Sequence, residues 1–182
     1  MKSLFTILTI LLIISLEIKC EGYCAESYLY ILNDSCINEL KESADDYFKG
    51  SDIEILKDSR GIILRFGITN PQKEYFKLSP NIYAKSLHIE HFLAKIKNPV
   101  IIEVHTENIS SQNIYGVKNW EMSTVIANRI EESMLKLGTD NLQRRINSIG
   151  YGEFLPSKNT SYNGGTYPNR VDIIILCSIS GE

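Results

Sequence analysis

Short apolar segments along the chain predict a set of β-strands. In residues 100–106, VIIEVHT, the side chains of Val100, Ile102 and Val104 occupy alternate positions and would share one face of a strand. Four further strands are predicted by apolar runs bounded by turn residues: two within residues 52–68 on either side of the turn DSRG, one in residues 144–152 and one in residues 170–178.

Three segments predict helices. Residues 33–50 combine capping residues, helix formers and a terminal glycine. A second helix should begin with Ser79 and Pro80 as N-cap and first turn and end at about Lys97, and a third should span about residues 119–137. The expected core contacts of these two helices are Ile82, Leu87, Phe92 and Ile96, and Met122, Ile126, Ile130, Met134 and Leu137.

The alternation of helices and strands predicts an α/β fold, a two-layer sandwich with a mixed sheet and helices on one face. The strands expected in one sheet lie near residues 62–66, 100–105, 144–149 and 171–177. The helices that begin near Pro80 and Asn119 should cover one face of it, whereas residues 70–80 and 153–169 are expected to be loops. A chain of 182 residues with 43% hydrophobic residues can bury a core of one domain and carry a short appendage.

The N-terminus predicts export. The apolar run from Leu4 to Leu16 is too short to span a bilayer comfortably and fits the core of a signal peptide. Cleavage after Gly22 and lipidation of Cys20, as in a bacterial lipoprotein, both remain open, as does an uncleaved signal. The expected organisation is a signal in residues 1–20, a helical segment in residues 21–50 and the main domain in residues 51–182.

Charge and cysteines narrow the picture. A net charge of −3 without a clustered basic face argues against nucleic acid as a partner. An exported protein can form disulfides, and Cys24 and Cys36 are the expected pair if Cys20 is lipidated or removed. Cys177 lies in the apolar run VDIIILC and is expected to be a buried free thiol.

Enzyme chemistry has little support in the sequence. His88 and His91 are three residues apart on a predicted helix, and a metal site would need a further ligand such as His105 brought close. Cys177 in a strand interior is a poor nucleophile. We therefore expect no catalytic residue, metal or cofactor.

Five sequence pieces follow one another in a recognisable order: GIILRF with EYFKLSP, VIIEVHTEN, NWEMSTVIA, INSIGYGEFLP and NRVDIII. In this order and spacing they make the run from Ile53 to Ser178 resemble the OmpA C-terminal-like family, including the periplasmic part of MotB-type proteins. VIIEVHTEN is similar to the family's I.V.GHTDN, and NWEMSTVIA to its NW.LS..RA. A stator-like proton channel, which MotB-type proteins also suggest, would need a full membrane helix with an embedded carboxylate, and Glu17 lies only at the end of a short segment.

The resemblance implies non-covalent binding of peptidoglycan in the cell envelope. In the family, the aspartate of HTD and the arginine of LS..RA hold the ammonium and carboxylate of the diamino acid in the stem peptide. Here Glu107 replaces the aspartate and Ile126 the arginine, while Arg170 and Asn169 stand at the NRRV pair and Val104 at the glycine before HTD.

The expected peptidoglycan-binding residues are Glu107, Asn108, Asn119, Arg129 and Arg170. Each has a structural alternative, namely a solvated loop carboxylate, turn or cap asparagines, and surface or strand-end arginines. Ile126 is expected in the core, and Ile126→Arg would tighten muropeptide binding only if the helix tolerates the charge.

Three tyrosines in predicted loops, Tyr115, Tyr162 and Tyr167, are further candidates for stacking on sugar. The expected location is the periplasm, attached to the outer membrane through a lipid or N-terminal anchor. The alternative is a degenerate domain that has lost peptidoglycan binding and contacts other envelope proteins.

Overall fold

The computed structural model describes residues 34–107, 116–136, 140–154, 161–162, 165–166 and 168–177. The expected signal segment, Cys20 and Cys24 lie outside these residues, as do Asn108, Leu137, Tyr115 and Tyr167. Among the residues that are described, no helix is both long and apolar enough to cross a membrane.

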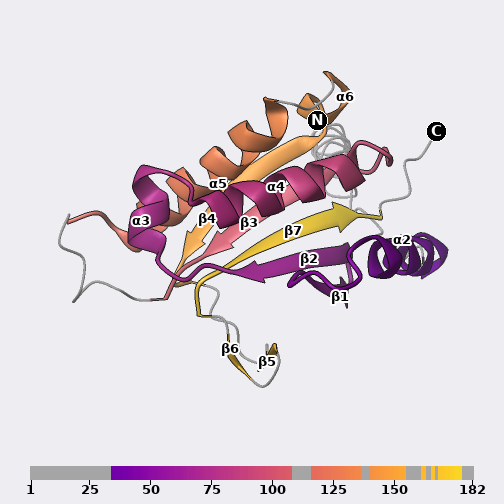
Figure 1. Ribbon diagram of the computed structural model, residues 1–182, viewed down its shortest axis with the longest axis horizontal. Helices are drawn as coiled ribbons and strands as arrows, with labels where there is room; N and C mark the ends of the chain where they lie inside the picture. The colour runs from indigo at the N-terminus through magenta and orange to yellow at the C-terminus, as the bar shows by residue number, and fades with distance from the viewer. Residues whose placement is uncertain are drawn as a thin grey trace, which may run out of the picture. The chain divides into compact units, whose positions relative to one another are not determined.

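One mixed sheet contains all the strands that the apolar pattern predicts (Figure 1). In spatial order its members are β1 (Glu54–Asp58), β2 (Gly61–Gly67), β7 (Arg170–Leu176), β3 (Val100–His105) and β4 (Ile146–Gly152). The first three pairings are antiparallel, and β3 with β4 is parallel. The predicted α/β sandwich with the four expected segments in one sheet is confirmed.

The two long predicted helices pack on this sheet, as Figure 1 shows. They are α4 (Pro80–Leu93) and α5 (Asn119–Leu135). The Ser79 hydroxyl accepts a hydrogen bond from Ile82 N at 3.4 Å, so the predicted N-cap is confirmed. The N-terminal helix α2 (Asp34–Tyr47) buries Ile37, Leu40 and Ala44 in the same core. Residues 32–182 form one compact unit, so this helical segment packs into the domain.

Two predicted loops contain regular structure. Residues 70–80 include the short helix α3 (Pro71–Phe76), because the Asn70 side chain caps it by accepting from Lys73 N at 3.0 Å and Pro71 fits the first turn. Residues 153–169 include a small hairpin of β5 (Ser161–Tyr162) and β6 (Gly165–Thr166). A further short helix, α6 (Asp140–Gln143), precedes β4.

Helix α4 ends at Leu93 rather than at about Lys97. Arg145, just before β4, donates to the carbonyl oxygens of Leu93 at 2.6 Å and Asn98 at 2.7 Å. A guanidinium satisfies carbonyl groups that a helix leaves unpaired at its C-terminus, so the chain can turn there and enter β3.

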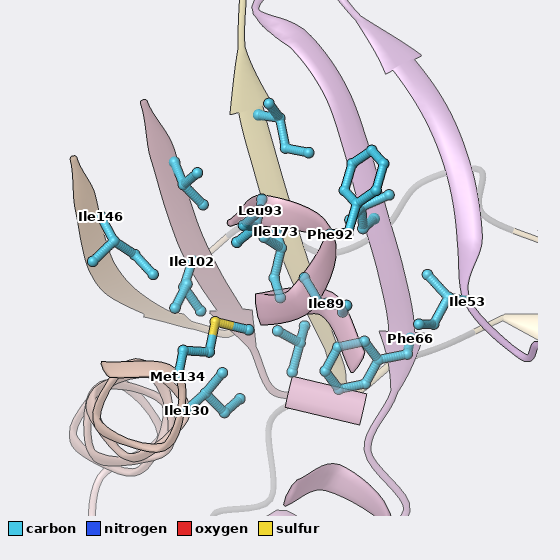
Figure 2. Close-up of a cluster of buried hydrophobic side chains, with 14 of the residues drawn as sticks. Ile53, Phe66, Ile89, Phe92, Leu93, Ile102, Ile130, Met134, Ile146 and Ile173 are labelled. Carbon is cyan, nitrogen blue, oxygen red and sulfur yellow. The ribbon is translucent and has the colours of Figure 1, made fainter. Parts of the chain in front are cut away.

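The core lies between the helices and one face of the sheet (Figure 2). Val100, Ile102 and Val104 of β3 are fully buried, as their alternation predicts. Helix α5 contributes Met122, Ile126, Ile130 and Met134, all of them at 0% exposure. In α4 the expected contacts Ile82 and Phe92 are buried, whereas Leu87 is only half-buried, because the helix also buries Ser86, Ile89 and Leu93.

The predicted disulfide pairing is wrong. Cys36 at the start of α2 is bonded to Cys177 directly after β7, with Cα atoms 5.9 Å apart. Cys177 is therefore not a free thiol, and Cys36 is not available to Cys24. The reason is tertiary: Asn98 donates to the Leu176 carbonyl at 2.9 Å and contacts the Cys36 sulfur at 3.7 Å, which places the end of β7 beside α2.

Helix α5 approaches β4 so closely that Gly150 cannot carry a side chain. An added Cβ would lie 2.1 Å from Thr124 N, which is backbone and cannot swing away. We expect Gly150→Ala to lower the free energy of unfolding by at least about 2 kcal/mol in urea titration. Gly116→Ala is the control, because no atom lies within 4 Å of its added Cβ and only its φ of +67° is unfavourable. Equal stability of Gly150→Ala and the wild type would contradict this close approach.

Candidate functional site

The ends of β3 and β4, the start of β7 and the start of α5 meet at one edge of the sheet (Figure 1). His105 pairs with Arg170 across β3 and β7, and Thr106 N donates to the Gly152 carbonyl at 3.0 Å. An added Cβ on Gly152 would lie 2.8 Å from Trp120 N, so α5 begins directly against the end of β4. The sequence pieces HTE, NWEMS, GYG and NRV therefore converge in space.

Glu107 is held in place by one buried side chain. Asn169, only 6% exposed, accepts a hydrogen bond from Glu107 N at 2.9 Å and donates to Glu107 Oε1 at 3.2 Å. This reciprocal pair, which we call the Asn169 clamp, fixes both the backbone and the carboxylate of an exposed residue. The sequence indicates only that Asn169 stands at the position of a family arginine. Its place beside Glu107 follows from the antiparallel pairing of β3 with β7, which the structure shows.

Two buried oxygen atoms lie at the same edge without a partner. Within the described residues, neither Thr106 Oγ1 nor Asn119 Oδ1 takes part in a hydrogen bond, although the residues are only 2% and 6% exposed. A buried polar atom without a partner is costly, so such atoms often mark the place of a ligand or an ordered water. Asn119 is the first residue of α5, where the N-cap Lys118 makes no side-chain capping bond.

The remaining motif residues here are structural. Ser123 is fully buried, accepts a hydrogen bond from Gly152 N at 2.8 Å and donates to the Trp120 carbonyl at 2.9 Å. It therefore joins the first turn of α5 to the end of β4. The serine of NWEMS and the second glycine of GYG are thus explained by helix–strand packing rather than by ligand chemistry.

The two arginines expected in the site, Arg129 and Arg170, make different contacts in the structure. Ile126, at the family arginine's position, is fully buried in the core as expected. Arg129 donates from Nε to the Tyr75 carbonyl at 3.0 Å and lines a cavity between α3, α4 and α5. Arg129 takes no part in the two hydrogen bonds between Glu107 and Asn169.

Arg170 belongs to a buried ion-pair network centred on Asp172. Its Nε donates to Asp172 Oδ2 at 3.0 Å, and Arg65 makes a bidentate pair with the same carboxylate at 2.6 and 2.8 Å. Burial raises the pKa of Asp172, but the hydrogen bond with Arg65 and the charges of both guanidiniums outweigh it and leave the pKa below its ordinary value. Asp172 thus stays ionised and anchors Arg170 next to the Asn169 clamp.

The network continues along β3 on the sheet face turned away from the core. Glu103 accepts from Arg60 Nη1 at 2.7 Å, and His105 Nε2 lies 3.6 Å from Glu103 and 3.7 Å from Asp172. Burial raises the pKa of Glu103, but its contacts with His105 and Arg60 lower the pKa by more, so it lies below its ordinary value.

Glu103, His105 and Asp172 lie close together but are a poor metal site. Ligand atoms of Glu103, His105 and Asp172 lie within 4.8 Å of one another. Both carboxylates, however, already pair with arginine guanidiniums, which neutralise them and would repel a cation. His88 instead packs against the rings of Tyr47 and Phe48, and His91 is exposed beside Glu90.

Exposed aromatic side chains flank the site. Trp120 is 49% exposed and Phe154 is 72% exposed, and they follow Asn119 and Gly152 closely in sequence. Sequence reasoning missed both, because exposure of an aromatic residue cannot be read from its neighbours alone. The expected sugar-stacking residues Tyr115 and Tyr167 lie outside the described residues, and so does the side chain of Tyr162.

Comparisons with known proteins identify the fold. Neither protein families nor curated protein sequences gave a match to this chain. A putative MotB-like protein from Desulfovibrio vulgaris is similar in structure, with a TM-score of 0.61, 21% identity, and coverage of 81% of this chain and 94% of that one.

Two further solved structures agree with it. The periplasmic domain of Helicobacter pylori MotB has a TM-score of 0.58 and 15% identity over 72% of this chain and 85% of that one. The cell wall anchor of the T6SS from Pseudomonas aeruginosa has a TM-score of 0.51 and 18% identity over 75% and 96% of the two chains. The chain therefore has the OmpA/MotB-like fold of MotB periplasmic domains, as its sequence resemblance predicts.

Proposed function

We propose that this domain binds peptidoglycan without covalent chemistry in the periplasm of a bacterium. Its ligand is the zwitterionic end of the diamino acid in the stem peptide, which carries one ammonium and one carboxylate. The proposal is supported by the shared fold with the periplasmic domain of MotB and with a protein described as a cell wall anchor. It makes the protein a binding module rather than an enzyme.

The observation that carries the proposal is the Asn169 clamp. An exposed glutamate at the end of a strand ordinarily moves with solvent, and ordering such a long side chain costs conformational entropy on binding. Asn169 holds the Glu107 carboxylate through Oε1 and its backbone through N–H. Oε2 has no hydrogen-bond partner among the described residues, so a preorganised anion is presented for an ammonium group.

The unpartnered oxygens complete this half of the site. An ammonium group has three donors and seeks acceptors only. Besides the Glu107 carboxylate, we assign Thr106 Oγ1 and Asn119 Oδ1 as its acceptors, because both are buried at the same edge of the sheet without a partner. Asn108, which follows Glu107, remains a proposed member of the site.

The ligand carboxylate needs a positive partner other than residue 126. Arg170 directly follows Asn169, and the two guanidiniums of Arg65 and Arg170 against the one carboxylate of Asp172 leave a net positive charge at this edge. The first turn of α5 adds backbone N–H groups and the positive end of the helix dipole, since no side chain caps it. We assign the carboxylate to these two elements, and not to Arg129, which engages Tyr75 and the helix cavity.

Glu107→Ala is the direct test. Removing the anion should weaken binding to purified sacculi by about 10- to 100-fold, the usual worth of a hydrogen bond to a charged group. Glu107→Gln should lose most of the same affinity, because the amide keeps the shape and removes the charge. The measurement is co-sedimentation of the full-length protein with sacculi over a range of protein concentrations.

Glu42→Ala is the matched control, since Glu42 is an exposed carboxylate on α2. It should bind sacculi as the wild type does, and circular dichroism should show all variants folded. If wild type and Glu107→Ala sediment equally, the site is vestigial.

If the site is vestigial, a second candidate function is favoured, in which the domain has the same fold and contacts other envelope proteins. The observation in its favour is Ile126, which is fully buried, so position 126 offers no guanidinium to a ligand carboxylate. Outer-membrane attachment through Cys20 or an uncleaved N-terminus concerns residues outside those described and stays a prediction, to be tested by palmitate labelling of wild type and Cys20→Ser.

A further inference from the structure

The cavity between α3, α4 and α5 shares no residue with the Asn169 clamp. Its volume is about 670 Å³, within the range of small-molecule sites. The residues that line it come from α3 and the segment after it, from the start of α4, and from the C-terminal half of α5 with the residue that follows: Lys73, Lys77, Leu78, Ser79, Pro80, Tyr83, Arg129, Glu132, Ser133 and Lys136.

The charge of this cavity contrasts with that of the whole protein. Four of its lining residues are cationic, Lys73, Lys77, Arg129 and Lys136, against the single carboxylate of Glu132, whereas the chain has a net charge of −3. None of these four cations forms an ion pair with another described residue. Lysines and arginines elsewhere in the domain do pair, for example Lys41 with Asp45 and Lys85 with Asp52.

The interior surface of the cavity is largely apolar despite this charge. Leu78 is half-buried, Tyr83 is 39% exposed, and long cationic side chains cover apolar surface with their methylene groups while their charged ends stay in water. Arg129 is held by its hydrogen bond to the Tyr75 carbonyl, so at least one cation is fixed before a ligand arrives. An apolar interior with a cationic rim matches a molecule that has an apolar body and an anionic head.

We propose that this cavity binds a single-chain anionic amphiphile, with its alkyl chain against Leu78, Pro80 and Tyr83 and its phosphate or carboxylate head among the lysines and Arg129. The apolar contact supplies most of the affinity, because removal of apolar surface from water is favourable in proportion to its area. The four unpaired cations supply selectivity for negative head groups. This site is independent of peptidoglycan binding.

Calorimetric titration of the full-length protein with dodecyl phosphate below its micelle concentration tests the proposal. We expect saturable binding, at least about 10-fold weaker in the double variant Lys77→Gln, Lys136→Gln, and weaker in high salt. Lys97→Gln is the control, because Lys97 is an exposed lysine outside the cavity, and it should bind as the wild type does. Dodecanoate distinguishes the sources: tighter binding of the phosphate indicates a phospholipid-type head, and tighter binding of the carboxylate a fatty acid.

Three results would overturn the proposal. Inorganic phosphate binding as tightly as dodecyl phosphate would reduce the cavity to a surface anion patch. Dodecyl maltoside binding as tightly would show that the cations select nothing, and an acidic peptide that binds where no amphiphile does would make the cavity a protein-docking site. The double variant Lys77→Gln, Lys136→Gln should bind sacculi as the wild type does, because neither lysine belongs to the Asn169 clamp. Failure of the amphiphile proposal can therefore be told apart from failure of the peptidoglycan proposal.

Discussion

Replacing both Cys36 and Cys177 by serine should cost this protein about 5 kcal/mol of its free energy of unfolding. The bond joins residues that are 141 positions apart, so it closes a loop around nearly the whole domain. In the chain-entropy account, the stabilisation grows with the logarithm of loop length and reaches about 5 kcal/mol for a loop of this size. For a domain of this length that corresponds to a fall in Tm of about 10–20 °C, measurable by thermal circular dichroism.

Single variants locate the bond. Cys177→Ser should lose the same stability as the double variant, whereas Cys24→Ser should leave Tm unchanged. If Cys24 were paired with Cys36, as expected from the sequence, Cys24→Ser would lower Tm and Cys177→Ser would not. A reducing agent should lower the Tm of the wild type toward that of the double variant, and an unchanged Tm would contradict the disulfide.

Strands and helices were predictable wherever one face is buried and the period is regular. The alternate residues Val100, Ile102 and Val104 define β3, and Met122, Ile126 and Ile130 define the buried stripe of α5. The errors occurred where local sequence is polar and tertiary contacts decide. Helix α4 ends early because Arg145 reaches its last carbonyl groups, and α3 forms because Asn70 and Pro71 start it.

The disulfide and the Asn169 clamp could not have been read from sequence for a related reason. Both join residues far apart along the chain, 141 positions in one case and 62 in the other. Their proximity follows from the strand order, in which β7 lies between β2 and β3. Apolar periodicity predicts that strands exist but leaves this order undetermined.

The family resemblance predicts the fold correctly, whereas the binding site that it implies is a proposal. Several of its matching residues, such as Ser123 and Gly152, are fixed by the contact between α5 and β4. A change at either position would disturb this packing, whatever the domain binds. Where the family motifs have an aspartate and two arginines, this chain has Glu107, Ile126 and Asn169. Ile126 lies in the core, and Asn169 holds Glu107.

Ile126→Arg should therefore destabilise the fold rather than restore a family site. Ile126 is 0% exposed and packs within the core between α5 and the sheet. A guanidinium there would be buried without a partner, which costs about 3–5 kcal/mol, and its greater length adds strain. The expected result is a fall in the urea midpoint of unfolding and weaker binding to sacculi in proportion to the unfolded fraction.

Ile126→Leu is the matched control, because it preserves volume and polarity and should cost less than about 1.5 kcal/mol. The sequence alone suggested that an arginine at this position would tighten muropeptide binding if the helix tolerated it, and the burial of Ile126 shows why it should not. An Ile126→Arg protein that keeps the wild-type urea midpoint and binds sacculi more tightly would refute this. It would mean that the new side chain leaves the core and reaches the ligand carboxylate at the start of α5, and the assignment of that carboxylate to Arg170 would fall with it.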